Sequence, residues 1–322
     1  MTERRTAADE IDQVAGNRGM VRPAPFPHHT STVTAGRRIV LGISGHQTTH
    51  LIGWTTVLVQ PGDTVHIVHG YSPIPYAATD WQLPVDNDNL VRGATERHVR
   101  AAAARLRRYR PDIEVLDELT GDPAATALAE AARGADLVLV GTPHCDRSQT
   151  VLARLLAKVD CPVMVLGTAP PATGQQVLAL LRGSQADDAV LQAAYAEAER
   201  LRCRLRVLKP WLAPLDGNVC YAETAERRML DGYLARWLER RPEVQVTPEL
   251  RFGDPLQVLT EHATVDQPLV VGLPRPTTDH AYFDAMNSSV ISVRERPTIV
   301  VPEPELTYRS LVTAGWLPDA AR

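Results

Sequence analysis

The chain contains the tripeptide Gly-Asp-Pro twice, as Gly121-Asp122-Pro123 and as Gly253-Asp254-Pro255. Each copy precedes a short helical pattern and then an apolar strand pattern that ends in Gly-X-Pro, at Gly141-Thr142-Pro143 and at Gly272-Leu273-Pro274. Matched features in the same order and at nearly the same spacing indicate an internal duplication. A chain of 322 residues is long enough for two such copies, so we expect two copies of one domain.

Within the first copy, short apolar runs alternate with helical patterns. The runs are Arg38–Ile43, Thr64–His69, Ile113–Leu119, Asp136–Val140 and Pro162–Leu166. Runs that are apolar throughout are typical of parallel strands covered on both faces, and right-handed crossovers place helices on both sides of the sheet. The runs of the second copy are Val177–Leu181, Arg204–Leu208, Val244–Leu250, Pro268–Val271 and Pro297–Val301. The pattern predicts two tandem Rossmann-like α/β domains, each a five-stranded parallel sheet with helices on both faces.

The predicted domain organisation follows from where this periodicity starts and stops. Residues 1–36 carry little apolar periodicity and several prolines, which predicts a flexible N-terminal tail. Residues 37–168 form the first domain, residues 169–174 a Pro-containing linker, and residues 175–302 the second domain. Residues 303–322 form a C-terminal extension, whose Trp and leucines we expect to dock on the chain's own domains in preference to a partner.

Composition excludes several classes of protein. The net charge is −4 at pH 7, so nothing indicates nucleic acid or an anionic membrane as a partner, and the arginines on helices are interpreted as solvated faces. None of the four cysteines forms a Cys-X-X-Cys pair, which favours a reducing cytoplasm. No apolar run is long enough to span a bilayer, and no targeting peptide is recognisable.

Each Gly-Asp-Pro turn suggests a structural role at the start of a helix. We expect Asp122 and Asp254 to cap the following helices through their carboxylates, with Pro123 and Pro255 at the first helical position.

Several of these segments together resemble the universal stress protein family, whose domains are adenine nucleotide alpha hydrolase-like. The resemblance rests on Ile39–Ile43, Val65–His69, Gly121–Ala124, Asp136–Gly141 and Cys161–Val165, and it is looser in the second copy. It implies a stress- or dormancy-linked cytoplasmic protein that is often dimeric. Many members bind ATP, and some are thought to act by binding partners. The last strand commonly pairs domains, so the resemblance places Val163–Leu166 against Thr298–Val301, or against the equivalents of another chain.

ATP-binding members carry an Asp at the end of the first strand and, after the fourth, a Gly-X-X-Gly loop followed nine residues later by Gly-Ser or Gly-Thr. Glycines let backbone amides wrap phosphate oxygens, and an ordinary residue forced to positive φ costs about 1–2 kcal/mol. In this chain Ser44 replaces the Asp, His144 and Gln149 replace two glycines, and only Gly141 and Thr150 remain. The second copy keeps Gly272 and Ser289 but carries Arg182 at the Asp position. We therefore expect tight ATP binding to be lost, although an altered site stays open.

A doubly wound sheet has a crevice at the carboxyl ends of its strands whatever residues lie there. The candidate residues of these vestigial nucleotide crevices are Ser44, Val68, Gly141, His144, Thr150, Arg182, Gly272 and Ser289. Arg182 and Arg275 are candidates for holding a phosphate-bearing ligand, against the simpler interpretation that they are solvated loop residues.

Two catalytic alternatives are disfavoured. His46 and His50 have a spacing that can chelate zinc, but no third ligand is indicated, so no metal is predicted. Gly42-Ile43-Ser44 supplies half of a nucleophile elbow but lacks the trailing glycine, so no catalytic residue and no enzyme activity is predicted. The favoured function is a stress-response protein that acts by protein interaction, with a homodimer through domain-edge strands as one possibility. The alternative is an ATP- or AMP-type nucleotide sensor that uses an altered pocket.

Overall fold

A computed structural model describes residues 36–45, 47–71, 86–142, 146–169, 176–212, 219–263, 267–274 and 297–303. All of these residues fall in a single compact unit. The predicted N-terminal tail and most of the predicted linker and C-terminal extension lie outside the described residues.

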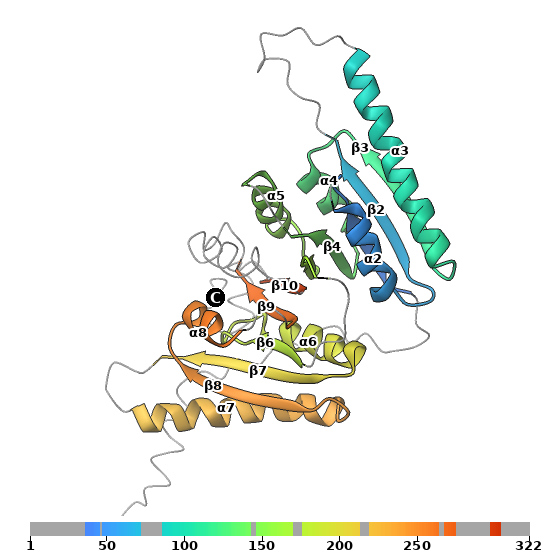
Figure 1. Ribbon diagram of the computed structural model, residues 1–322. Coiled ribbons are helices and arrows are strands. Elements are labelled where there is room, and N and C mark those ends of the chain that lie inside the picture. Colours follow the sequence, from blue (N-terminus) through green and yellow to red (C-terminus); the bar gives the residue numbers. More distant parts are fainter. Residues whose placement is uncertain are drawn as a thin grey trace, which may run out of the picture. The chain divides into compact units, whose positions relative to one another are not determined.

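The first half of this unit alternates strands with helices as predicted (Figure 1). Its elements are β1 (Arg38–Gly42), α2 (Thr48–Leu58), β2 (Thr64–Gly70), α3 (Asp86–Tyr109), β3 (Glu114–Thr120), α4 (Ala124–Ala131), β4 (Leu137–Gly141), α5 (Asp146–Leu156) and β5 (Val163–Leu166). The strands lie in the order β3-β2-β1-β4-β5, and each neighbouring pair is parallel.

The second half repeats this arrangement. Its elements are β6 (Gln176–Leu180), α6 (Asp187–Leu201), β7 (Arg204–Trp211), α7 (Val219–Arg240), β8 (Val246–Phe252), α8 (Pro255–His262), β9 (Leu269–Leu273) and β10 (Thr298–Pro302). The strand order is β8-β7-β6-β9-β10, again with parallel neighbours, which is the order expected of a duplicated domain. The helix predicted around Ser289–Arg294 lies outside the described residues. Strand β7 is longer than predicted because Lys209–Trp211 continue the pairing with β8.

The two halves meet through their last strands. β5 and β10 pair antiparallel, with Ile299 opposite Met164, and join the halves into one ten-stranded sheet. The expectation that these strands face each other is confirmed, and the pairing occurs within one chain. The outer strands of the described sheet are therefore β3 and β8.

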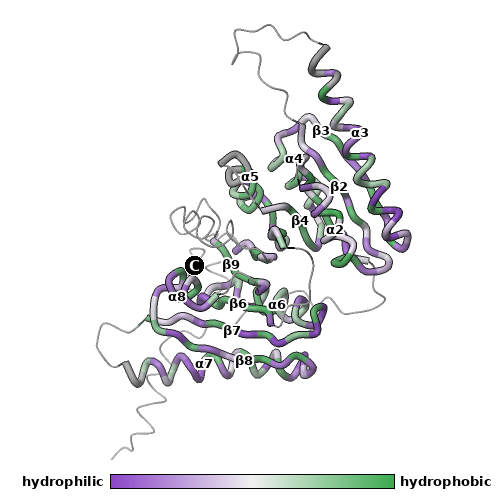
Figure 2. Tube along the Cα trace, in the orientation of Figure 1, coloured by the Kyte–Doolittle hydropathy of each residue, from purple (hydrophilic) through white to green (hydrophobic). Residues whose placement is uncertain are grey.

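The core lies on both faces of the sheet, which explains the continuous apolar runs. Ile39 and Leu41 of β1 point to one face and belong to a buried cluster that extends through side chains of α2, α3, α6 and α7. Val40 points to the other face and belongs to a second cluster, which extends through side chains of α4, α5 and α8. Figure 2 shows β4, β6 and β9 as largely hydrophobic, whereas β7, β8, α3 and α7 carry hydrophilic positions between their apolar ones.

The two Gly-Asp-Pro turns differ. Asp254 caps α8 as predicted, because its carboxylate accepts hydrogen bonds from the backbone amides of Leu256 (2.9 Å) and Gln257 (3.3 Å). The prediction for Asp122 is wrong. α4 begins one position later, with Pro123 at the cap, and the Asp122 carboxylate accepts a hydrogen bond from the Thr120 hydroxyl (2.9 Å).

Candidate functional site

Each half has a crevice position at the carboxyl ends of its strands, between the strand that starts the half and its neighbours. In the first half the structure brings Ser44, Val68 and Gly141 to this position, because Ser44 follows β1, Val68 pairs with Gly42, and Gly141 ends β4. In the second half, Arg182 follows β6 and Gly272 lies in β9, the neighbour of β6.

Part of the predicted site falls outside the described residues. His144, Ser289 and Arg275 are among them, and Thr150 lies within α5 but its side chain is not described. The structure therefore places five of the eight predicted site residues fully.

At the first crevice, the side chain of Gln47 covers Gly141. A Cβ atom on Gly141 would overlap the present position of the Gln47 side-chain amide, so a larger residue there requires the flexible Gln47 side chain to move. The Gln47 Nε2 group donates a hydrogen bond to the carbonyl oxygen of Thr142 (3.2 Å), which ties α2 to the end of β4. The glycine that the family resemblance assigns to nucleotide binding thus lies under a side chain of this chain.

Hydroxyl, backbone carbonyl and imidazole groups lie along the rim of the first crevice. The Thr48 hydroxyl donates to the carbonyl oxygen of Ser44 (2.8 Å) and lies 2.8 Å from His98 Nε2, which therefore acts as the donor. His69 Nδ1 lies 2.8 Å from the carbonyl oxygen of Ile43, so that nitrogen carries a proton. Ser44 itself is exposed.

At the second crevice, charged groups are paired with one another. Arg182 Nη1 lies 3.3 Å from Glu303 Oε1, and the side chain of Arg182 is only 20% exposed. Lys209 Nζ lies 3.3 Å from Glu226 Oε2. The interpretation of Arg182 as a solvated loop residue is therefore wrong, because it bridges the end of β6 to the residue after β10.

Asp187 holds the turn between β6 and α6. Its carboxylate accepts hydrogen bonds from the backbone amides of Arg182 (3.1 Å) and Gly183 (2.8 Å). Gly183 has φ +75°, a conformation that favours glycine. Burial raises the pKa of Asp187, and these two amides and the charge of Lys209 act in the opposite direction. The amides of this turn are thus occupied by a carboxylate of the chain itself.

Gly272 is also explained by helix packing. A Cβ atom on it would lie 3.0 Å from Ala186 Cβ and 3.2 Å from Val190 Cγ2, both on the α6 side. Close contact between the sheet and α6 therefore accounts for the glycine at position 272.

Sequence reasoning missed four groups that lie at the crevice positions, namely Gln47, Asp187, Lys209 and Glu303. Three of them directly follow a strand end or start a helix, so their positions in the chain were a usable signal. Their partners were not visible, since Gln47 and the carbonyl oxygen it binds are separated by 95 positions.

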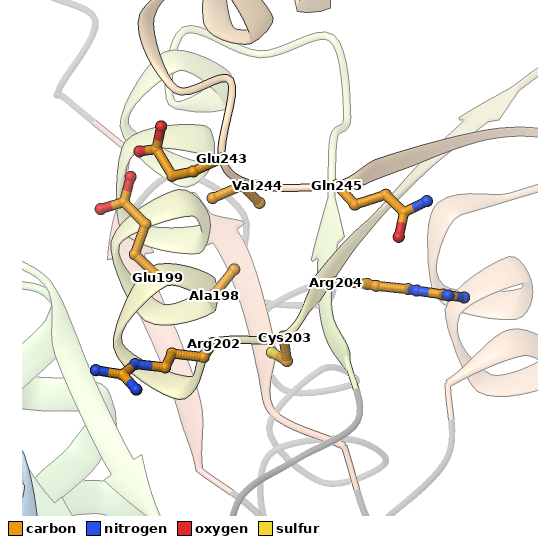
Figure 3. A pocket seen from close by; sticks show the side chains of 8 residues that line it. All are labelled: Ala198, Glu199, Arg202, Cys203, Arg204, Glu243, Val244 and Gln245. Atoms are coloured by element: carbon orange, nitrogen blue, oxygen red, sulfur yellow. The ribbon is translucent and has the colours of Figure 1, made fainter.

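A cavity of about 630 Å³ lies elsewhere, at the amino ends of β7 and β8 (Figure 3). Figure 3 shows the carboxylates of Glu199 and Glu243 on one side, while Arg202 and Arg204 extend away from each other. Its thiol, Cys203, has a pKa raised by burial, and burial raises the pKa of Cys161 to about 11. Thiols with raised pKa values are weak nucleophiles, so neither indicates covalent chemistry.

The disfavoured metal site has no support from the described side chains. His50 Nε2 lies 2.5 Å from the carbonyl oxygen of Gly167, and His46 is outside the described residues. Among the described residues, no group of three or more His, Cys, Asp and Glu side chains is placed to hold a metal ion. No helix in the described part of the chain has both the length and the apolar character needed to cross a membrane.

Comparison with known proteins gives a consistent result. Residues 36–167 match the Universal stress protein family. A universal stress protein of Mycolicibacterium smegmatis is 27% identical over 228 residues, which cover 65% of this chain and 76% of that protein.

Solved structures share the fold over most of the chain. A universal stress protein from Archaeoglobus fulgidus superposes with a TM-score of 0.62 at 13% identity, over 84% of this chain and 97% of the other. A putative universal stress protein from Pseudomonas aeruginosa has a TM-score of 0.51 at 16% identity, over 83% and 94%. The cytoplasmic domain of a prokaryotic cation chloride cotransporter has a TM-score of 0.52 at 11% identity, over 82% and 95%. At these identities the likeness shows the fold alone.

Proposed function

We propose that this protein serves a stress response by binding other proteins, and that both of its crevices stay closed to nucleotide. Its residues 36–167 belong to the universal stress protein family. The family supports the stress-response role. Binding of proteins and closure of the crevices are our proposal, and it involves no catalytic residue and no metal.

One observation carries the proposal, which is that side chains of the chain itself lie against both retained glycines. Gln47 covers Gly141, and Ala186 and Val190 press against Gly272. A triphosphate needs bare backbone amides close to its oxygens. Side chains in contact with both retained glycines leave no room for that approach from the helix side.

Charge supports the same proposal at the second crevice. The amides of Arg182 and Gly183 donate to Asp187, so they are not available to an anion. Arg182 and Lys209 each lie within salt-bridge distance of a glutamate. An incoming phosphate has to displace these pairings, which costs the free energy of each one.

Equilibrium dialysis of the purified protein against ATP, ADP, AMP and cyclic AMP with Mg²⁺ tests the proposal. We expect no saturable binding up to several millimolar and no nucleotide released when freshly purified protein is denatured. Thermal unfolding provides a second readout, because a ligand of the folded state raises the melting temperature by mass action. Saturable ATP binding near one per crevice contradicts the proposal.

The alternative function is a nucleotide sensor with an altered pocket, and ATP is its candidate ligand. The observation that favours it is the presence of two cations, Arg182 and Lys209, at the second crevice. If nucleotide binds, the double variant Arg182→Ala/Lys209→Ala shows at which crevice it binds. Nucleotide bound at the second crevice is lost in this variant, whereas nucleotide bound at the first crevice is kept.

The remaining parts of the proposal concern organisation. We propose domains at residues 37–168 and 175–302 in a cytoplasmic protein. If two copies of the chain pair through the edges of their sheets, the strands available in the described sheet are β3 and β8, since β5 and β10 pair with each other. Pro248 lies in β8 and has no backbone N–H to donate.

A further inference from the structure

The two outer strands of the described sheet, β3 and β8, each have one free edge (Figure 1). The free edge of a strand presents backbone N–H and C=O groups, which can pair with a strand of another chain. Whether an edge can do so depends on which residues face outward, what already occupies their backbone groups and which charges the strand carries.

In β8 the odd-numbered residues face β7. The carbonyl oxygen of Gln245 accepts a hydrogen bond from the amide of Leu205 (2.9 Å), and the amide of Gly253 donates to the carbonyl oxygen of Trp211 (3.0 Å). Successive residues of a strand turn their backbone groups to opposite sides, so the even-numbered residues face the free edge. These residues are Val246, Pro248, Leu250 and Phe252. Pro248 thus lacks its N–H on the free side, which is where an edge strand tolerates proline.

The free edge of β3 is already occupied in part. The amide of Glu114 and the carbonyl oxygen of Thr120 face β2, so the odd-numbered residues between them face outward. Arg107 donates to the outward carbonyl oxygen of Val115 (2.6 Å) and to the carboxylate of Asp117 (2.8 Å). β3 also carries three carboxylates and no basic residue, so two copies of it bring like charges together. These features disfavour β3 as a pairing edge.

The sequence of β8 is complementary to itself in one antiparallel register. With Leu250 opposite the partner's Leu250, Glu249 lies opposite the partner's Arg251 and Phe252 lies opposite the partner's Pro248. A two-fold axis at Glu249 or at Arg251 instead places two like charges opposite each other, which is destabilising. Opposite charges therefore select the register centred on Leu250, and such a pair closes as a two-fold dimer.

The outward backbone groups of β8 fit the same register. Leu250 faces outward in both copies, so the two residues exchange N–H···O=C hydrogen bonds. The amide of Phe252 also faces outward, and it donates to the carbonyl oxygen of the partner's Pro248. Proline removes only its own donation to this ladder, so it weakens the pairing without preventing it.

Apolar side chains on one face of β8 gain contacts in this pairing. Phe252 is 65% exposed, although its ring packs edge-on against Trp211 with 5.6 Å between the ring centroids. Pro248 is exposed and lies on the same face of the strand, because side chains alternate between faces. The pairing places each Phe252 ring opposite the partner's Pro248, so both groups lose contact with water.

The charged side chains lie on the other face of β8. The side chain of Arg251 is 45% exposed and lies 3.1 Å from Glu249 of the same strand. Glu249 also accepts two hydrogen bonds from Arg206, which hold its carboxylate in place. A carboxylate has capacity for several donors, so Glu249 can also accept from the partner's Arg251.

We infer that β8 pairs antiparallel with β8 of a second copy of this chain, about a two-fold axis at Leu250. The inference deepens the homodimer of the proposed function and rests on it, because it names the edge and the register.

Sedimentation of the full-length protein and residue-resolved hydrogen exchange test the inference. We expect a monomer–dimer equilibrium at protein concentrations up to about 1 mM. The amides of Leu250 and Phe252 are expected to gain protection as the protein concentration rises. The amides of Glu249 and Arg251 face β7, so we expect them to be protected at every concentration, and they serve as internal controls.

The variant Arg251→Glu places a glutamate opposite Glu249 at both ends of the pairing. We expect it to raise the dissociation constant of the dimer at least about tenfold. The matched control is Arg108→Glu, which changes an exposed arginine of α3 and alters the net charge equally. We expect its dissociation constant to stay within about twofold of the parent value. Circular dichroism and melting temperature establish that both variants fold.

Three results overturn the inference. They are a monomer over the whole concentration range, equal losses in the two variants, and protection at the outward amides of β3 in place of Leu250 and Phe252. A dimer without protection at Leu250 and Phe252 leaves the proposed homodimer intact and rejects only this edge. Saturable ATP binding in dialysis contradicts closure of the crevices without changing the dimer, so the failures are distinguishable.

Discussion

The two crevices occupy the same place in two copies of one fold, yet different groups lie at them. At the first, these groups are the amide of Gln47, the hydroxyl of Thr48 and imidazoles. At the second, they are a buried carboxylate, Asp187, and two ion pairs. In both halves the helix after the first strand supplies a side chain that contacts the retained glycine.

This difference teaches that packing and polar chemistry diverge separately after duplication. At Gly272, which faces the buried residues Ala186 and Val190, a larger side chain disturbs the core. The polar groups around that contact only need partners, and many sets of partners satisfy them. The glycines therefore persist while Ser44 and Arg182 differ at corresponding positions.

The largest expected effect is at Gly272. Gly272→Val is expected to lower the free energy of unfolding by about 3 kcal/mol, because the new methyl groups meet Ala186 and Val190, which have no room to turn away. Gly141→Val is expected to cost about 1 kcal/mol, since the flexible Gln47 side chain can move. Urea unfolding of both variants measures the difference. Equal costs would show that the two helices pack alike.

The next effect is at Asp187. Asp187→Ala leaves the amides of Arg182 and Gly183 without their acceptor, so we expect a loss of about 2 kcal/mol and faster hydrogen exchange at both amides. Gln47→Ala removes a single hydrogen bond to Thr142 and is expected to cost about 1 kcal/mol. Unchanged exchange at Gly183 in the Asp187 variant would contradict the assigned role.

The smallest effects are expected at the ion pairs that join each outer strand of the sheet to the neighbouring strand. Arg206 holds Glu249 through two hydrogen bonds (2.6 and 2.9 Å) and lowers the pKa of that carboxyl. Because the pKa of Glu249 is lower in the folded protein than its ordinary value of about 4.5, the ion pair adds its full stability above about pH 4.5. That stability is lost as the pH falls through the lower pKa of the folded protein. Glu249→Gln is therefore expected to cost about 1 kcal/mol at pH 7 and almost nothing near pH 2.

The corresponding pair in the first half is weaker. Glu118 lies 3.0 Å from His66 but is 49% exposed. Glu118→Gln is expected to cost less than about 0.5 kcal/mol at pH 7. Thermal unfolding of both variants across this pH range checks the comparison, and a larger loss for Glu118 than for Glu249 would reverse it.

The sequence predicted where the candidate site lies, but not which side chains of the protein contact its residues. Ser44, Val68 and Gly141 were expected together at the crevice of a doubly wound sheet, and the structure brings them together, because they lie at or just after the carboxyl ends of neighbouring parallel strands. The solvated role of Arg182 was wrong because its partner, Glu303, is 121 positions away. Asp122 was expected as a cap and is not one, since the start of a helix depends on backbone geometry that the tripeptide alone does not fix.

The sequence by itself determined the alternation of strands and helices and the duplication, since apolar periodicity and turn residues act between neighbours in the chain. Only the tertiary structure shows what lies against Gly141 and Gly272, because Gln47, Ala186 and Val190 are far from these glycines in the sequence. It also decided that β5 pairs with β10 in the same chain. A strand edge is equally able to pair within a chain or between chains, and only the position of the second half selects the partner.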